Sequence, residues 1–201
     1  MKTVLIVLGV LAAAAVICVL FVIGQYNGLV NRAQAVDAQW AQVQNVYQRR
    51  ADLIPNLVAT VSGAANFEKS TLTEITNARA SVGKVQINPG GTPSAAQLAE
   101  FEKAQGALSS ALSRLLVVSE QYPALRATAN FQTLQAQLEG TENRISVERE
   151  RFNEVVRTYD TAVHSFPSSI MAGIFSFHDK PYFAAAPQAQ SAPTVNFPTF
   201  K

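Results

Sequence analysis

The chain has 201 residues, which is enough for one membrane anchor and one domain of ordinary size. Its formal net charge is only +2, from 16 basic and 14 acidic residues, and this balance excludes a general electrostatic attraction to nucleic acid. The single cysteine, Cys18, excludes an intramolecular disulfide and a cysteine metal cluster.

The N-terminal segment is apolar. Residues 4–23 carry no charged side chain, and at about 1.5 Å per residue they span roughly 30 Å, the thickness of a bilayer hydrocarbon core. The alternatives are a cleaved signal peptide, a lipoprotein signal at Cys18 and a buried core helix. The run continues past the small residues at 12–15, which argues against a cleaved signal peptide, and the large Ile17 before Cys18 argues against a lipoprotein signal. A buried core helix is disfavoured because the run leaves no solvated face. We therefore expect residues 1–25 to form a retained transmembrane anchor.

The flanks of this segment bear on its orientation and contacts. Lys2 and the terminal amine precede it, whereas Arg32 is the only basic residue close behind it. This margin of one charge favours a cytoplasmic N-terminus and an extracytoplasmic domain. Gly24 and Gly28 form a G-x-x-x-G at its exit, a spacing that lets two helices approach closely in lipid. The simpler interpretation, which we favour, is a flexible juxtamembrane step.

A first helix is predicted to continue directly from the anchor. Apolar residues recur at steps of three and four, which is typical of a helix that packs along one stripe. They are Tyr26, Val30, Ala33, Val36, Trp40, Val43 and Tyr47. We expect Pro55 to end or kink this helix, because proline lacks an N–H and restricts the residue before it.

Three further helices are predicted. The second carries apolar residues between Leu57 and Val82, and a loop rich in glycine and proline follows over residues 83–93. Thr92 followed by Pro93 predicts the start of a third helix, which carries the leucines up to Leu115.

The last helix follows a break at residues 122–123. Asn130 is predicted to cap it, and its apolar residues extend from Phe131 to Phe166, where Pro167 stops it.

These patterns predict an all-α fold, in which the N-terminal transmembrane helix continues into an antiparallel, four-helix, coiled-coil-like bundle over residues 26–166. Such a path returns Phe166 to the membrane side. The apolar and aromatic residues 167–183 then either contact the lipid interface or cap the bundle core. Residues 184–201 are predicted to lack fixed structure. The candidate lipid-interface residues are Ile174, Phe175, Phe177, Tyr182 and Phe183.

Several short motifs add a family resemblance. They are Tyr-Asn-Gly-Leu-Val at 26–30, Ala-Gln-Trp-Ala-Gln-Val at 38–43, Arg-Arg-Ala-Asp-Leu-Ile-Pro-Asn-Leu-Val at 49–58, Tyr-Pro at 122–123, Phe-Gln-Thr-Leu-Gln at 131–135, Thr-Glu-Asn-Arg-Ile at 141–145, Phe-Pro at 166–167 and, more loosely, Pro-Tyr-Phe at 181–183. Together these motifs resemble the LemA family of bacterial membrane proteins. The resemblance implies a single N-terminal anchor, a helical bundle and a place in the bacterial cell membrane. It implies no established enzymatic activity and no agreed catalytic residues.

One polar cluster stands out from the apolar patterns. It comprises Arg49, Arg50, Asp52 and Asn56 near the predicted first turn, with Glu142, Asn143 and Arg144 on the last helix. Such groups could bind an anion or a peptide terminus. We favour the alternative, in which they satisfy backbone groups and fix the register of the helices.

No motif indicates catalysis or a cofactor. His164 and His178 are separated by a proline and have no acidic cluster that would complete a metal site. Gly90 and Gly91 lack the lysine and the spacing of a phosphate-binding loop. Two functions remain: a membrane scaffold that associates with copies of itself, or a tethered adaptor that presents a peptide or partner-helix site to an envelope enzyme.

Overall fold

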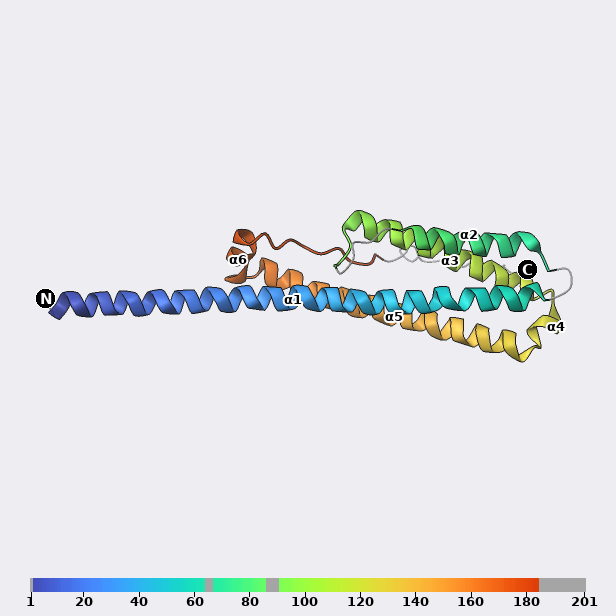
Figure 1. The fold of residues 1–201 in the computed structure, drawn as a ribbon, viewed down its shortest axis with the longest axis horizontal. Helices are drawn as coiled ribbons and strands as arrows, with labels where there is room; N and C mark the ends of the chain where they lie inside the picture. Colours follow the sequence, from blue (N-terminus) through green and yellow to red (C-terminus); the bar gives the residue numbers. More distant parts are fainter. Residues whose placement is uncertain (1, 64–66, 86–90, 185–201) are drawn as a thin grey trace, which may run out of the picture.

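The computed structural model describes residues 2–63, 67–85 and 91–184, and within these ranges the chain forms six helices and no strand (Figure 1). The predicted all-α class is confirmed. The expected unstructured segment, residues 184–201, lies outside the described residues except for Ala184. The helices are α1 (Lys2–Ser62), α2 (Lys69–Lys84), α3 (Ala95–Ser119), α4 (Pro123–Arg126), α5 (Ala129–His164) and α6 (Ser168–Ile174).

Helix α1 is continuous over 61 residues, which corresponds to a length of about 90 Å. Its N-terminal part extends beyond every other element (Figure 1). Residues 2–21 are all exposed, and they include the apolar stretch that is long enough to cross a membrane. The predicted continuation of this segment into the first bundle helix is confirmed, and Gly24 and Gly28 do not interrupt the helix.

The predicted end of the first helix at Pro55 is wrong, because α1 continues through this proline to Ser62. A proline at this position cannot donate to the carbonyl of Ala51, four residues earlier. The side chain of Arg79 on α2 replaces that donor, with Nε 3.1 Å from the Ala51 carbonyl oxygen. The apolar seam also continues past Pro55, and Leu57 and Val61 are fully buried on α1. They therefore do not begin the second helix, which starts at Lys69.

Two other helix starts differ from the prediction by two residues each. Ser94, not Thr92, caps α3, and it forms a capping box with Gln97. Thr128, not Asn130, caps α5 by accepting a hydrogen bond from the backbone N–H of Phe131. Each cap is a hydroxyl whose position depends on the preceding turn, which the sequence pattern does not fix.

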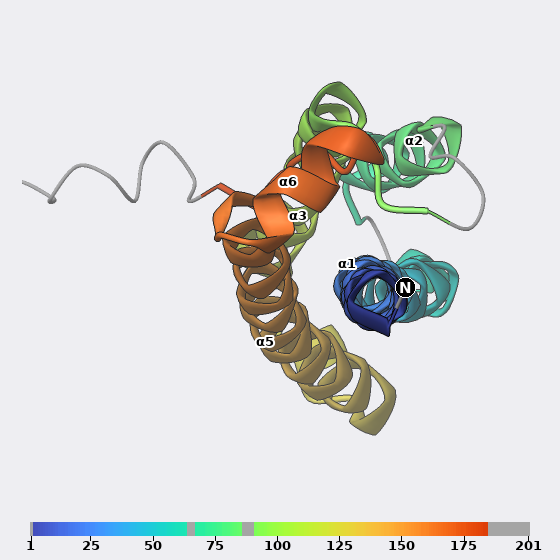
Figure 2. The same ribbon diagram turned by 90° about the vertical axis from the view of Figure 1, so that its left-hand side faces the viewer.

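The four long helices run antiparallel in chain order, and they pair as α1 with α5 and α2 with α3 (Figures 1 and 2). The α2–α3 hairpin then packs on the α1–α5 pair. Helix α4 is a single turn between α3 and α5, and α6 packs against both α1 and α5 at the opposite end.

The interior contains two hydrophobic cores. The proximal core lies towards the protruding N-terminal part of α1, and its buried residues are Leu29, Val36, Trp40, Val43, Tyr47, Leu98, Phe101, Ile145, Phe152, Val156, Tyr159, Val163, Ala172 and Phe183. The distal core lies at the other end, and its buried residues are Ile54, Leu57, Val61, Ile75, Leu108, Ala111, Leu112, Leu115, Leu125, Phe131, Leu134 and Leu138.

After α6 a turn at residues 175–176 leads into an extended strap, residues 177–184, along α5. Asn153 holds both backbone groups of Phe183: its Nδ2 donates to the carbonyl at 3.0 Å and its Oδ1 accepts from the N–H at 2.9 Å. Asp160 accepts from the N–H of Lys180 at 3.1 Å, and the Tyr159 hydroxyl donates to the carbonyl of His178 at 3.0 Å. Side chains of α5 therefore replace the partners that a sheet would give an extended chain.

Candidate functional site

The predicted polar cluster is centred on Arg50, whose side chain is only 2% exposed. Its Nη1 donates to Ser109 Oγ at 2.9 Å and to Glu142 Oε2 at 3.0 Å. Its Nη2 donates to the side-chain and main-chain oxygens of Gln105. One guanidinium therefore joins α1, α3 and α5, and its Nη donors are bonded to groups of the same chain.

This network lies between the two cores. On α1, Tyr47 belongs to the proximal core and Ile54 to the distal core, with Arg50 between them. On α3, Gln105 likewise lies between Phe101 and Leu108. We call Arg50, Gln105, Ser109 and Glu142 the polar layer. A buried polar layer of this kind fixes helix register in bundles, because any shift leaves its groups unpaired.

The structure brings together only two of the seven predicted cluster residues, Arg50 and Glu142. Asp52 is exposed and accepts a hydrogen bond from Gln48 on its own helix at 2.7 Å. The remaining members, all exposed, are Arg49, Asn56, Asn143 and Arg144.

Sequence reasoning missed Gln105 and Ser109. The signal for Gln105 is its register, because Phe101, Gln105, Leu108 and Leu112 follow steps of four, three and four. A polar residue in such a seam position marks a buried polar contact. Arg50 has the same signature, three residues after Tyr47 and four before Ile54.

A small pocket of about 200 Å³ lies beside the polar layer, between α3 and α5. Arg50, Ser109 and Glu142 contribute its polar part. Its other lining residues are mostly apolar or uncharged, namely Leu112, Ser113, Leu116, Gln135, Leu138 and Glu139. The pocket suits a small, largely apolar group, since the Nη donors of Arg50 already have partners.

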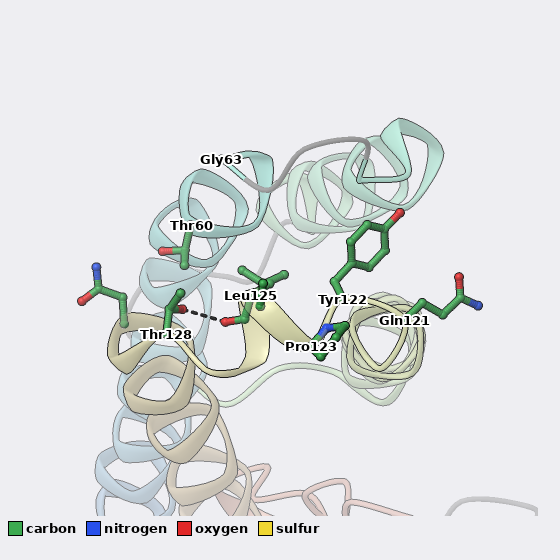
Figure 3. A pocket seen from close by; sticks show the side chains of 9 residues that line it. Thr60, Gly63, Gln121, Tyr122, Pro123, Leu125 and Thr128 are labelled. Carbon is green, nitrogen blue, oxygen red and sulfur yellow. Dashed lines mark hydrogen bonds between the residues drawn. The ribbon is translucent and has the colours of Figure 1, made fainter.

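A larger pocket of about 600 Å³ lies at the end of the bundle farthest from the N-terminus, around the α4 turn (Figure 3). Thr60 and Gly63 come from the end of α1, and Tyr122, Pro123 and Leu125 come from the connection between α3 and α5. Thr128 Oγ1 donates to the Leu125 carbonyl at 2.7 Å and fixes this turn. The pocket is open and combines apolar rings with a few hydroxyl and amide groups, a composition that suits a peptide or small organic ligand.

The predicted lipid-interface residues fall into two groups. Ile174 and Phe175 are exposed at the end of α6, and Tyr182 is exposed on the strap. Phe177 is partly buried against the proximal core. Phe183 is buried in that core, with its ring 5.4 Å from the ring of Phe152, so its assignment to the lipid interface is wrong. The strap carries it inward, because Asn153 holds its backbone against α5.

The two glycines at the exit of the apolar segment also differ. A methyl group added at Gly24 would meet nothing within 4 Å, so the helix surface there is open. At Gly28 it would lie 3.2 Å from the guanidinium of Arg32, whose Nη1 donates to the Gly28 carbonyl at 3.1 Å.

A sequence profile of the LemA family matches residues 39–197. The chain belongs to the LemA family. Magnetosome protein MamQ 2 of Paramagnetospirillum magneticum is 27% identical and aligns with 91% of this chain and 72% of its own length. Magnetosome protein MamQ of Magnetospirillum gryphiswaldense is 26% identical, with 81% and 66% covered. Protein LemA of Metamycoplasma hominis is 20% identical, with 82% and 71% covered.

The LemA match includes the polar layer and the strap, and it begins after the apolar N-terminal segment. That segment, fully exposed on α1, and the family together make this a membrane-associated protein. The names of the relatives are not names of enzymes.

Ionisable groups close to the strap have shifted pKa values. Burial raises the pKa of Glu102. The positive charge of Arg149, whose Nη2 lies 2.7 Å from Glu102 Oε1, partly offsets this rise. The same Arg149 nitrogen donates to the Ala184 carbonyl at 3.0 Å. Burial raises the pKa of Tyr47 and Tyr159. These shifts result from enclosure in the proximal core and need no ligand to explain them.

The two histidines do not come together. His164 pairs with Asp179 through Nε2 at 2.9 Å on the exposed surface. His178 lies on the strap, where its carbonyl accepts from Tyr159. Among the described residues there is no group of three or more His, Cys, Asp and Glu that could hold a metal ion.

Proposed function

We propose that this LemA-family protein is a non-enzymatic scaffold of the bacterial cell membrane, which associates with copies of itself and organises that surface. The observation that supports it is the continuity of α1, which is one helix from the apolar N-terminal segment to the far end of the bundle. Membrane anchor and bundle therefore form one body, without a linker that would let the bundle swivel.

The bundle part of α1 is the spine of both cores. Its buried residues run from Leu29 to Val61 and pack chiefly against α5. At about 1.5 Å per residue, this part is roughly 50 Å long. A rigid rod of this length suits a spacer or an assembly unit better than a flexible tether.

The polar layer supports a role without catalysis. The Nη atoms of Arg50 are bonded to Gln105, Ser109 and Glu142, and its buried Nε has no partner among the described residues. A charged group whose donors are bonded to neighbouring helices fixes the packing of those helices, and its role does not require a substrate.

Light scattering during size-exclusion chromatography of the detergent-solubilised protein tests self-association. The proposal expects a discrete oligomer, and a clean monomer would overturn it. Gly24→Leu and Gly140→Leu form a matched pair, because both glycines lie in helices with open space around them. Loss of the oligomer only in Gly24→Leu would locate the contact in the membrane part of α1.

The orientation is a separate part of the proposal. We place the bundle on the extracytoplasmic side of the cytoplasmic membrane, from the one-charge margin at the N-terminus. Cys18 is the only cysteine, so Val117→Cys in a Cys18→Ser background gives one exposed thiol on the bundle. Labelling of intact cells by a membrane-impermeant maleimide is expected, and labelling only after lysis would reverse the orientation.

The second candidate function is a membrane-tethered adaptor, and the pocket around α4 favours it (Figure 3). This pocket lies at the end of the bundle farthest from the membrane, where a peptide or helix of another protein has free access. A monomer in the light-scattering experiment would leave the adaptor as the better account.

A further inference from the structure

The end of the bundle nearest the apolar segment carries an exposed hydrophobic face. Phe166 is 81% exposed, Ile174 65%, Ile170 51% and Phe175 47%. Ile170 and Ile174 belong to α6, Phe175 directly follows it, and Phe166 lies two residues before it. We call them the α6 face. Elsewhere in the described bundle, exposed large hydrophobic side chains are scattered singly, as is usual for a soluble surface.

The position of this face relative to the apolar segment is fixed by ring contacts. The ring of Tyr26 on α1 lies 4.8 Å from that of Phe175 and 5.9 Å from that of Phe177, both in edge-to-face geometry. Tyr26 lies three residues after Ile23, where the uncharged apolar run ends. That interval corresponds to about 4.5 Å along the helix axis.

This distance places the α6 face at a definite depth. When residues 4–23 fill the hydrocarbon core, Tyr26 lies within the polar interface, which is roughly 5–8 Å thick on each side. Phe175 is in contact with Tyr26, so it lies at the same level. Aromatic side chains favour this level of a bilayer.

The direction of the face agrees with its depth. Viewed from the N-terminal end of α1, α6 lies in front of α3 and across the end of α5, so it is the element of the bundle that meets the membrane first (Figure 2). Charged side chains nearby have partners within the chain: Nε2 of His164 lies 2.9 Å from Oδ1 of Asp179, and Nη1 of Arg32 donates to the Gly28 carbonyl.

We propose that the α6 face inserts into the interface of the same bilayer that α1 crosses, and gives the protein a second attachment to the membrane. The ligand is the lipid surface itself, because the continuity of α1 brings this face to it. The first attachment is α1 itself, and the second lies beside it, so together they restrain the tilt of the whole bundle. The inference rests on α1 crossing the bilayer, as the proposed function does, but not on self-association.

A pair of matched labels tests this contact. Ile174 is 65% exposed and lies at the membrane-side end of the bundle. Val117 is equally exposed, at 64%, and lies near the other end of the bundle, at the end of α3. Each is replaced by cysteine in the full-length Cys18→Ser protein and labelled with an environment-sensitive fluorophore. The samples are nanodiscs of phosphatidylcholine with one protein each, with or without bromine on the upper acyl chain.

We expect brominated lipid to reduce the emission of the Ile174→Cys label by about half and to leave the Val117→Cys label unchanged. Equal, negligible quenching of both labels would overturn the proposal, as would equal strong quenching, which means that the bundle lies flat on the bilayer. A blue-shifted label at residue 174 that bromine does not quench would also overturn it, because protein then covers the face. Since each disc holds one copy, failure here would leave the oligomer experiment unaffected.

Discussion

The proximal core packs aromatic rings where the distal core packs mainly aliphatic side chains. Trp40 lies within 6.0 Å, ring centre to ring centre, of Phe101, Phe152 and Phe183. In the distal core the buried residues are leucine, isoleucine, valine and alanine, with Phe131 as the single ring. Ring pairs have preferred geometries, whereas aliphatic side chains adapt more easily. The packing of the half next to the apolar N-terminal segment is therefore the more narrowly specified one.

The two halves also differ in how their helices are connected. The strap binds α5 in the proximal half, and Lys180 links it to Asp37 on α1 with Nζ 3.5 Å from Oδ1. At the distal end, the short α4 turn and an open pocket take the place of such a strap. Under the proposed function, the proximal half would hold the bundle on its anchor, and the distal half would present a surface for a partner.

The largest expected effect is that of Trp40→Ala. It removes the ring at the centre of the proximal core and should lower the free energy of unfolding by about 4 kcal/mol. Leu57→Ala in the distal core should cost about 3 kcal/mol. Denaturant unfolding is followed by circular dichroism in both variants, because Trp40 is the only tryptophan and Trp40→Ala has no tryptophan fluorescence to follow. A cost for Leu57→Ala well above that for Trp40→Ala would contradict the proposed division.

The conservative Trp40→Phe is the control for the ring. Trp40 Nε1 is buried and has no hydrogen-bond partner among the described residues. Phenylalanine lacks this donor, so the variant should lose less than about 2 kcal/mol in spite of its smaller volume.

Next in size is Arg50→Ala, which opens the polar layer between the halves. It leaves Gln105 without its partner and creates a cavity, so we expect a loss of about 3 kcal/mol in the free energy of unfolding. Arg50→Met fills most of the space but also leaves Gln105 without its partner, so it should still lose about 2 kcal/mol. If Arg50→Met instead kept the stability of the parent, packing volume rather than polar bonding would hold the halves together.

The arrangement of the long helices can be predicted from the sequence, because apolar periodicity determines which face each helix buries. The seam of α1 and the continuity with the anchor followed from spacing alone. The sequence does not reveal that α1 continues past Pro55, because the cost of a proline, about 3 kcal/mol, is local, whereas the burial of Leu57 and the bond from Arg79 are contacts with distant elements.

The site was less predictable than the fold. Arg50 occupies a seam position, so its burial was readable, but its partners on α3 depend on how two hairpins dock. Phe183 could not be placed for the same reason. Its aromatic character suits lipid and core equally well, and only the pairing of its backbone with Asn153 decides between them.

A smaller effect is expected when the strap is released. Asn153→Ala removes both bonds to the Phe183 backbone and should cost about 1–2 kcal/mol. Faster hydrogen exchange at Phe183 and Lys180, with unchanged protection of the distal helices, would show that the loss is local to the proximal half. Asn143→Ala is the control, since Asn143 is exposed on the same helix, and it should change stability by less than about 0.5 kcal/mol.

The smallest expected effect is a selective loss of the proximal half at alkaline pH. Partial desolvation and the neighbouring Asp160 carboxylate raise the pKa of Tyr182 from 10.0 to about 12, although its side chain stays 43% exposed. Burial raises the pKa of Tyr47 and Tyr159 as well. The folded state thus holds these protons more tightly than the unfolded state does. The resulting stability is complete below pH 10 and is lost as the pH rises through the raised values.

Tyr182→Phe removes one of these groups, so the variant should lose less stability than the parent between pH 10 and about 12. Tyrosinate absorbance should show one fewer late-titrating phenol, and denaturant unfolding at each pH gives the stability. Asp160→Asn should move the pKa of Tyr182 back towards 10, because the carboxylate no longer opposes the phenolate. If alkaline pH instead released α2 and α3 before the strap, the tyrosines would not be the weak point and the contrast between the two halves would have another cause.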